Sequence, residues 1–191
     1  MRLTLLKEIA TILFGILEKS KEERCDIQWV TTSNLHPNNV LAKYESNLSF
    51  EPTEALSVKD GDILVRRIAP SYVNYLQEAS PCGYIANNLI IIRATKRVDS
   101  KYLAYYLDKN ITKIIKKAAK GTTLPTLTRQ DLGEFEIILP SEKIQHIVGN
   151  LWFLEIEKIK LQEKLRDLEN QKLHYLLNEC IKKQRSNNDH F

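Results

Sequence analysis

The sequence has few of the residues that carry metal and redox chemistry. Its three cysteines, Cys25, Cys82 and Cys180, lie far apart without a Cys-x-x-Cys pair, and its four histidines are equally scattered. Neither set has the ligand spacing of a structural zinc site, and three distant thiols do not build a disulfide framework. We therefore expect reduced thiols, no metal and no cofactor.

Glycine is scarce as well, and this excludes the common phosphate-binding loops. None of the six glycines builds a Gly-x-x-x-x-Gly-Lys loop or a Gly-x-Gly-x-x-Gly fingerprint, and the Gly-x-Ser-x-Gly and His-Glu-x-x-His motifs are missing. A metal-dependent nuclease needs an acidic-x-Lys triplet on a strand. The triplet Asp99-Ser100-Lys101 instead stands where a helix begins, which predicts a capping aspartate. The sequence predicts that the chain is not an enzyme by itself.

Long apolar runs are also missing. The apolar amino end, LTLLKEIATILFGIL (3–17), is interrupted at Lys7 and Glu8, and no small-residue cleavage site follows it. A buried helix or strand is therefore expected there, not a signal peptide. No segment approaches the roughly 20 apolar residues that span a bilayer. We expect a cytoplasmic protein without a membrane partner.

What the sequence does contain is a concentrated positive charge. Between Lys101 and Gln130 there are seven basic residues and one acid, Asp108, so the segment carries 7 − 1 = +6, whereas the whole chain carries +4. The rest of the protein is therefore slightly acidic. A local positive potential of this kind indicates an anionic partner.

The chain between residues 56 and 140 has the patterns of alternating strands and short helices. An Asp-Gly turn at Asp60-Gly61 precedes a strand in LSVKDGDILVRRI (56–68), and YIANNLIIIRA (84–94) predicts a second, central strand. An amphipathic helix is expected over 99–119, capped at Asp99 or Ser100, with its lysines on the exposed face and Gly121 at its end.

The segment after this helix is punctuated by caps and prolines. Thr122–Pro125 must be extended because the residue before proline avoids helical angles. Thr128 and Asp131 have the spacing of a capping box that opens a very short helix. EFEIILP (134–140) then predicts a strand that Pro140 ends.

A long helix is predicted from Ser141 to about Arg185. Apolar residues follow a 4,3 spacing that is typical of a coiled coil, with Lys158 inside the seam and a slip after Leu168. At about 1.5 Å per residue the helix spans roughly 65 Å, more than one small domain covers. We expect it to pair with another helix through Ile147, Leu151, Leu154, Leu161, Leu165, Leu168, Leu173 and Leu176.

These patterns predict an α+β protein, in which a mixed domain with a small β-sheet and short helices precedes one long C-terminal helix that forms a coiled coil. The same patterns divide the chain into a first domain over residues 1–140, a long helix over 141–185 and a disordered tail over 186–191.

The order of these motifs resembles the specificity subunits of type I restriction-modification systems. The resemblance covers roughly residues 56–180 and is carried by GDILV (61–65), KYLAYYLDK (101–109), AKGTTLPTLTRQDLGEFEIILP (119–140) and SEKIQHIVGNLWFLEIEKIKLQEKLRDLENQKLHYLL (141–177). It implies that residues 1–140 are the DNA-binding target-recognition domain and residues 141–185 the dimerisation helix. The family typically has two recognition domains and two conserved helices, whereas this sequence has one of each. The family's Pro-x-x-x-Glu-Gln box appears here with Ile144 in place of the glutamate.

The resemblance implies a half-subunit that dimerises through its C-terminal helix, reads one half of a split target in double-stranded DNA, and scaffolds methyltransferase subunits and, through them, the restriction subunit. In the family the helices pair antiparallel. The alternative from the residues alone is a coiled-coil interaction protein, or a decoy half-subunit that occupies the methyltransferase without contacting DNA.

The candidate DNA contacts divide into two kinds. Lysines at a helix end, with the Gly-Thr-Thr corner, suit phosphates, unless that corner only ends the helix. Arginine and asparagine suit base edges, unless they are surface charge or turn residues. The candidates are Arg66, Arg67, Tyr72, Asn74, Asn87, Asn88, Lys113, Lys116, Lys117, Lys120, Gly121, Thr122, Thr123 and Arg129, and beyond these Arg93 and Tyr75. Trp152 and Phe153 are expected to pack against the domain rather than to form an exposed stacking platform.

Overall fold

The computed structural model describes residues 2–15, 28–30, 32, 35, 57–77, 83–85, 87–119 and 125–188. Lys120, Gly121, Thr122 and Thr123 lie outside these described residues. The chain divides into two compact units, Met1–Leu154 and Glu155–Phe191, and the unit boundary falls inside the long C-terminal helix.

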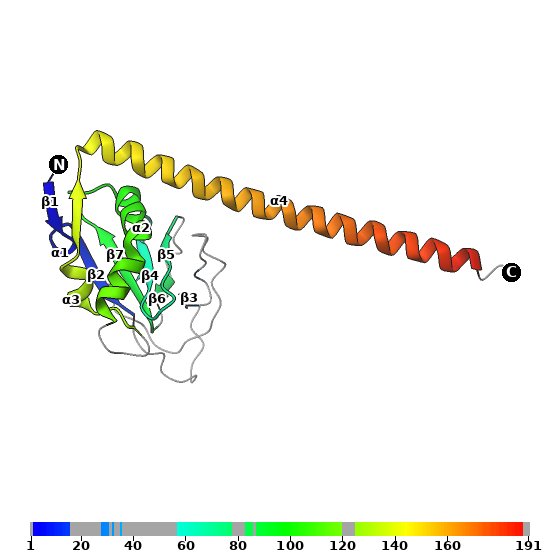
Figure 1. Ribbon diagram of the computed structural model, residues 1–191, viewed down its shortest axis with the longest axis horizontal. Coiled ribbons are helices and arrows are strands. Elements are labelled where there is room, and N and C mark those ends of the chain that lie inside the picture. The colour runs from blue at the N-terminus through cyan, green and yellow to red at the C-terminus, as the bar shows by residue number, and fades with distance from the viewer. Residues whose placement is uncertain are drawn as a thin grey trace. The chain divides into compact units, whose positions relative to one another are not determined.

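The first unit alternates short strands and helices (Figure 1). Its elements are β1 (Arg2–Leu5), α1 (Leu6–Ile9), β2 (Ala10–Phe14), β3 (Gln28–Val30), β4 (Ile63–Arg66), β5 (Val73–Tyr75), β6 (Gly83–Ile85), β7 (Leu89–Ala94), α2 (Ser100–Ala118), α3 (Arg129–Gly133), β8 (Glu136–Leu139) and the beginning of α4 (Glu142–Asn188). The predicted α+β class is confirmed.

The central sheet is antiparallel, with the strand order β2-β7-β4-β5. β1 pairs antiparallel with β8, and β3 pairs parallel with β6. The first four residues of β7, Leu89 to Ile92, are completely buried, as expected for a strand that has neighbours on both sides. The prediction that this segment is central is therefore confirmed.

α2 packs on this sheet through an apolar stripe in which Leu103 and Leu107 are fully buried. Asp99 caps it, since the Asp99 side chain accepts a hydrogen bond from the Tyr102 N–H at 2.8 Å. Lys113, Lys116 and Lys117 are exposed on the opposite face. The helix, its capping aspartate and its lysine-bearing face were all predicted from sequence.

The strand expected over residues 84–94 is wrong in one respect, because a turn divides it into β6 and β7. At that turn Asn88 has a φ of 67°, which no strand residue adopts and which asparagine tolerates better than most residues. The Asn87 Oδ1 accepts the Asn88 N–H at 2.9 Å and so stabilises the turn. The amino end likewise forms both predicted alternatives, as α1 lies between β1 and β2.

α3 begins with the predicted capping box. Thr128 Oγ1 accepts the Asp131 N–H at 3.1 Å, and the Asp131 side chain accepts the Thr128 N–H at 3.0 Å. β8 follows, with Ile137 buried between exposed neighbours.

α4 has 47 residues and continues to Asn188, so the first three residues of the predicted tail are helical. Its first turns pack on the domain through Gln145, Gly149 and Trp152, which are all buried. The Trp152 indole hydrogen-bonds Asp108, although burial raises the pKa of that carboxyl overall. Phe153 stacks edge-on against Tyr75 with 5.7 Å between ring centroids. The predicted packing of Trp152 and Phe153 is therefore confirmed.

The second unit consists of the remainder of α4. Its leucines are exposed over most of their surface, including Leu161 at 64% and Leu165 at 57%. Among the described residues, no helix is long and apolar enough to cross a membrane.

Candidate nucleic-acid interface

Strand pairing brings several of the predicted contact residues to one end of the central sheet. Phe14, the last residue of β2, lies opposite Ile90, and Arg66, the last residue of β4, lies opposite Leu89. The β4–β5 connection and the Asn87-Asn88 turn lie at the same end, since the Arg67 N–H donates to the Asn88 carbonyl at 2.8 Å. Residues that are distant in sequence thus form one surface.

The chain that follows the Gly-Thr-Thr corner joins this end of the sheet. The Leu127 N–H donates to the Arg67 carbonyl at 2.9 Å, and the Ala69 N–H donates to the Pro125 carbonyl at 3.3 Å. Ile68 and Thr126 form an antiparallel bridge between these contacts. The segment from Pro125 to Leu127 therefore acts as an added edge beside the arginine-bearing β4–β5 connection.

Two arginines lie against one aromatic ring here. The guanidinium carbons of Arg67 and Arg129 lie 5.5 Å and 5.2 Å from the centroid of the Phe14 ring. Arg129 also donates to the Ile12 carbonyl at 2.6 Å, and Arg67 Nε donates to the Leu127 carbonyl at 3.2 Å. We refer to Arg66, Arg67 and Arg129, together with Phe14, as the arginine cluster.

No carboxylate in the described part of the chain forms an ion pair with an arginine of this cluster; the ion pairs there involve Arg93, Lys109, His146 and lysines of α4. The Arg66 Nε is moreover buried without a hydrogen-bond partner. Three cations at one end of a sheet, with no neutralising carboxylate among the residues that the structure describes, produce a positive potential that attracts anions.

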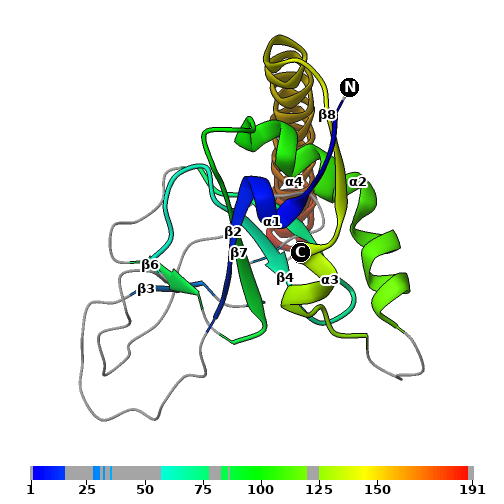
Figure 2. The same cartoon turned by 90° about the vertical axis from the view of Figure 1, so that its left-hand side faces the viewer.

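The exposed lysines of α2 extend this positive surface. Lys113, Lys116 and Lys117 lie in the C-terminal half of the helix. Figures 1 and 2 place that half of α2 at the end of the domain where β2 ends and β7 begins. The tertiary structure therefore gathers the described lysines and the arginine cluster at the same end.

Three other candidates have structural partners. Asn74 is fully buried, and its Nδ2 donates to the Val73 carbonyl at 3.1 Å. Arg93 pairs with Asp62 at 2.7 Å. The prediction for Asn74 is corrected, because a fully buried side chain cannot reach a duplex, whereas Arg93 is 25% exposed and its contact with DNA stays a prediction. Tyr72 is half-buried against the core of the sheet, although the β4–β5 connection that carries it belongs to the positive end.

Phe14 was missed by sequence reasoning. It lies within the apolar run of the amino end, and that run predicts core packing for every member. Only the pairing of β2 with β7, and the segment that places Arg129 beside it, reveal its role.

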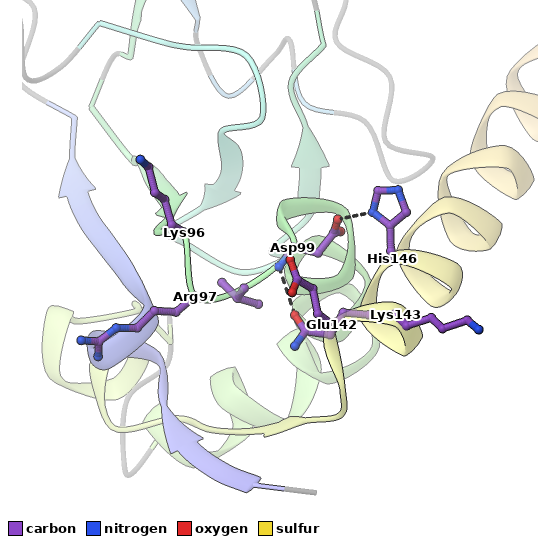
Figure 3. Close-up of a pocket in the computed structure, with 8 residues that line it drawn as sticks. Lys96, Arg97, Asp99, Glu142, Lys143 and His146 are labelled. Carbon is purple, nitrogen blue, oxygen red and sulfur yellow. Dashed lines mark hydrogen bonds and ion pairs between the residues drawn. The ribbon is translucent and has the colours of Figure 1, made fainter.

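A cleft near the other end of this domain is built by structural contacts. It has a volume of about 580 Å³ and is lined by Lys96, Arg97, Val98, Asp99, Glu142, Lys143, Gln145 and His146 (Figure 3). Gln145 accepts the Asp99 N–H at 3.0 Å and donates to the Pro140 carbonyl at 3.0 Å, and His146 lies 3.0 Å from Asp99. These contacts join α4 to the start of α2. The described residues contain no group of His, Cys, Asp or Glu that could hold a metal ion.

The fold and this site define a class of protein: a small α+β recognition domain with a basic end, followed by a long helix whose apolar seam is exposed. The sequence matches the type I restriction modification DNA specificity domain over residues 5–170. The chain belongs to this family, and the resemblance seen in the sequence is confirmed.

Solved structures agree on the fold. A chain from a study of complex assembly and conformational transition in the type I restriction-modification system is 17% identical, with a TM-score of 0.59 over 90% of this chain and 43% of that chain. The specificity subunit of M. genitalium is 17% identical, with a TM-score of 0.58 over 85% of this chain and 41% of its own. The specificity subunit (HsdS) of Thermoanaerobacter tengcongensis is 18% identical, with a TM-score of 0.59 over 82% and 37%.

The chain therefore spans less than half the length of these solved proteins. Among curated proteins, none matches the sequence.

Proposed function

We propose that this chain is a sequence-specific DNA-binding half-subunit of a type I restriction-modification system, without catalytic activity of its own. It dimerises through α4, so that two copies read a bipartite target in double-stranded DNA. The dimer holds methyltransferase subunits and, through them, the restriction subunit.

The observation that carries the DNA-binding part is the gathering of cations at one end of the domain. Arg66 and Arg67 at the end of β4 meet Arg129 of α3 there, and exposed lysines of α2 lie at the same end. Lysine suits phosphates as a mobile point charge, whereas arginine suits paired acceptors on base edges. A surface that contains both kinds is suited to holding a duplex and reading it.

The observation that carries the dimerisation part is the exposure of the seam. Ile147, Leu151 and Leu154 are 46%, 63% and 62% exposed, although the same turns of α4 bury Gln145, Gly149 and Trp152. The helix thus packs on its own domain with one face and leaves an apolar face uncovered. Apolar rows of this length are covered by another helix in stable proteins.

The same exposed seam favours the alternative function, a decoy half-subunit that occupies the methyltransferase and does not contact DNA. The two proposals differ in whether the purified chain binds duplexes.

The test is the salt dependence of binding to a fluorescent duplex between about 50 and 200 mM salt. The native chain is expected to bind with a steep slope, because each neutralised phosphate releases counterions. In the combined variant Lys116→Ala and Lys117→Ala the slope should fall by up to about two, roughly one per lysine.

A matched control is Lys164→Ala with Lys172→Ala, which removes two exposed lysines of α4 outside the proposed interface and should leave the slope unchanged. An unchanged slope in the α2 variant removes these lysines from the interface. A native chain that binds no duplex even at low salt leaves only the decoy proposal.

A further inference from the structure

Arg67 is held in place at both its backbone and its side chain. Its N–H donates to the Asn88 carbonyl at 2.8 Å and its carbonyl accepts the Leu127 N–H at 2.9 Å. Its Nε donates to the Leu127 carbonyl at 3.2 Å, and the guanidinium faces Phe14 at 5.5 Å. These contacts fix an arginine side chain that is otherwise among the most mobile.

Among the described residues, no partner engages the two terminal nitrogens of Arg67. Within the described residues, the bond from Nε is the hydrogen bond that this side chain makes. Arg93, on the neighbouring strand, differs in this respect, since its Nε and one terminal nitrogen both donate to Asp62, at 2.7 Å and 2.8 Å. Asp62 therefore engages Nε and one terminal nitrogen of Arg93 together, whereas among the described residues Arg67 keeps both terminal nitrogens as an oriented pair of donors.

Phe14 and Arg129 complete the arrangement. Arg129 faces the same ring at 5.2 Å and is anchored to the Ile12 carbonyl. Two guanidinium groups beside one ring repel each other, and among the described residues no carboxylate pairs with either of them. An anionic or strongly accepting ligand would relieve that repulsion.

We propose that Arg67 is the specificity-determining residue of this surface and makes a bidentate hydrogen bond to a paired acceptor on the duplex. Two groups of DNA offer that chemistry: the O6 and N7 edge of guanine, and two oxygens of one phosphate. Phe14 and Arg129 are positioning residues that orient the guanidinium group of Arg67 toward this acceptor. This inference rests on the proposed DNA-binding function and names the residue that carries it.

The test uses a library of double-stranded DNA with a randomised central region, from which the full-length chain and its variants select bound molecules. Arg67→Lys keeps the charge but loses the planar fork. If Arg67 reads guanine, the variant should lose the preference for one G·C pair of the native motif. Replacement of that pair should cost the native chain roughly 5- to 150-fold in affinity, and the variant almost nothing.

If Arg67 instead holds a phosphate, Arg67→Lys should keep the native motif and weaken binding to every duplex by a similar factor. Loss of the G·C preference supports the whole proposal, whereas the phosphate result supports the bidentate contact and overturns the specificity-determining role. A variant with native affinity and the native motif overturns both. A native chain that enriches no sequence and binds no duplex overturns the proposed function together with this inference, so the two failures are distinguishable.

Two further variants separate positioning from folding. Phe14→Leu removes the ring but keeps an apolar side chain, and should weaken the Arg67-dependent preference by roughly 2- to 5-fold, the contribution of a cation–π contact. An unchanged preference in this variant excludes the positioning role of Phe14. The matched control is Arg97→Lys, an exposed arginine beyond the other end of β7, which should behave as the native chain. Thermal unfolding checks that all variants are folded.

Discussion

The arginines of this domain are distinguished by what holds their guanidinium groups. Arg93 faces Asp62, whose side chain is almost completely buried and also accepts the Lys59 N–H at 2.8 Å. The hydrogen bond to Asp62 is the main cause of the raised pKa of Arg93, so the guanidinium stays charged. Arg93 thus neutralises a buried carboxylate and stabilises the fold.

Replacing Arg93 tests this role. Arg93→Met keeps most of the side-chain volume but leaves the Asp62 carboxylate buried and unpaired. Because a broken buried pair is costly, we expect a loss of about 3 kcal/mol in the free energy of unfolding, measured by urea denaturation. Arg97→Met, at an exposed site of the same strand connection, should change stability by less than about 0.5 kcal/mol. If both variants unfold at the same urea concentration, the structural role of Arg93 is contradicted.

The local sequence pattern does not separate Arg67 from Arg93, since each belongs to the basic end of an apolar strand segment, ILVRR (63–67) and LIIIR (89–93). The register of β4 against β7, in which Ile63 lies opposite Ile92, places Arg93 next to Asp62. The same register places Arg66 and Arg67 at the open end of the sheet. The chemical type of each candidate was predictable, whereas its partner depended on strand pairing.

At the scale of elements, α4 has two faces with different tasks. Gln145, Gly149 and Trp152 recur at steps of four and three and are buried against the domain, while Ile147, Leu151 and Leu154 point away. Gly149 lies where α4 meets the start of α2. A Cβ built there would be 2.6 Å from the Tyr102 nitrogen and 2.8 Å from an Asp99 oxygen, so only glycine allows this approach.

The prediction at this scale concerns Gly149→Ala. Alanine favours a helix by about 1 kcal/mol over glycine, yet here the added methyl collides with backbone, and overpacking of this kind costs about 1–3 kcal/mol. We expect net destabilisation in thermal unfolding. Asn178→Ala, at an exposed position of the same helix, should stabilise slightly. If both substitutions raise the melting temperature, the claim that α4 packs too closely on the start of α2 for a side chain at position 149 is rejected.

The helices were the most predictable elements because their signals are local. Each signal depends on neighbours within a few residues: the N-cap at Asp99, the capping box of Thr128 and Asp131, and the regular spacing of apolar residues in α4. The break between β6 and β7 was not predictable, since an asparagine pair inside an apolar run indicates neither a strand nor a turn by itself. The positive φ of Asn88 is set by the chain around it.

At the scale of the whole molecule, the apolar seam requires a partner that the chain does not supply in its described parts. Leu161, Leu165 and Leu168 remain 64%, 57% and 53% exposed in the second unit. Covering a leucine contributes about 1.5–3 kcal/mol, so a paired seam stabilises both helices. Pairing with a second copy is the proposal that accounts for this exposure.

The corresponding prediction is that Leu161→Asp with Leu165→Asp abolishes the dimer. The lost burial, roughly 3–6 kcal/mol, weakens association more than 100-fold. Sedimentation velocity should therefore show a dimer for the native chain and a monomer for the variant. The control Arg166→Gln with Asn170→Asp changes the charge by the same −2 off the seam and should remain dimeric. A native monomer, or a variant that still dimerises, rejects pairing through this seam.

The sequence by itself determined the family, the capped helices, the local excess of positive charge and the apolar seam, because each is expressed by residues close together along the chain. Only the tertiary structure decided which charged side chains are available. Strand pairing buried Asn74, joined Arg93 to Asp62, and brought Phe14, Arg67 and Arg129 together from segments more than fifty residues apart. Contacts of that kind depend on register and on packing between elements, and local patterns do not specify them.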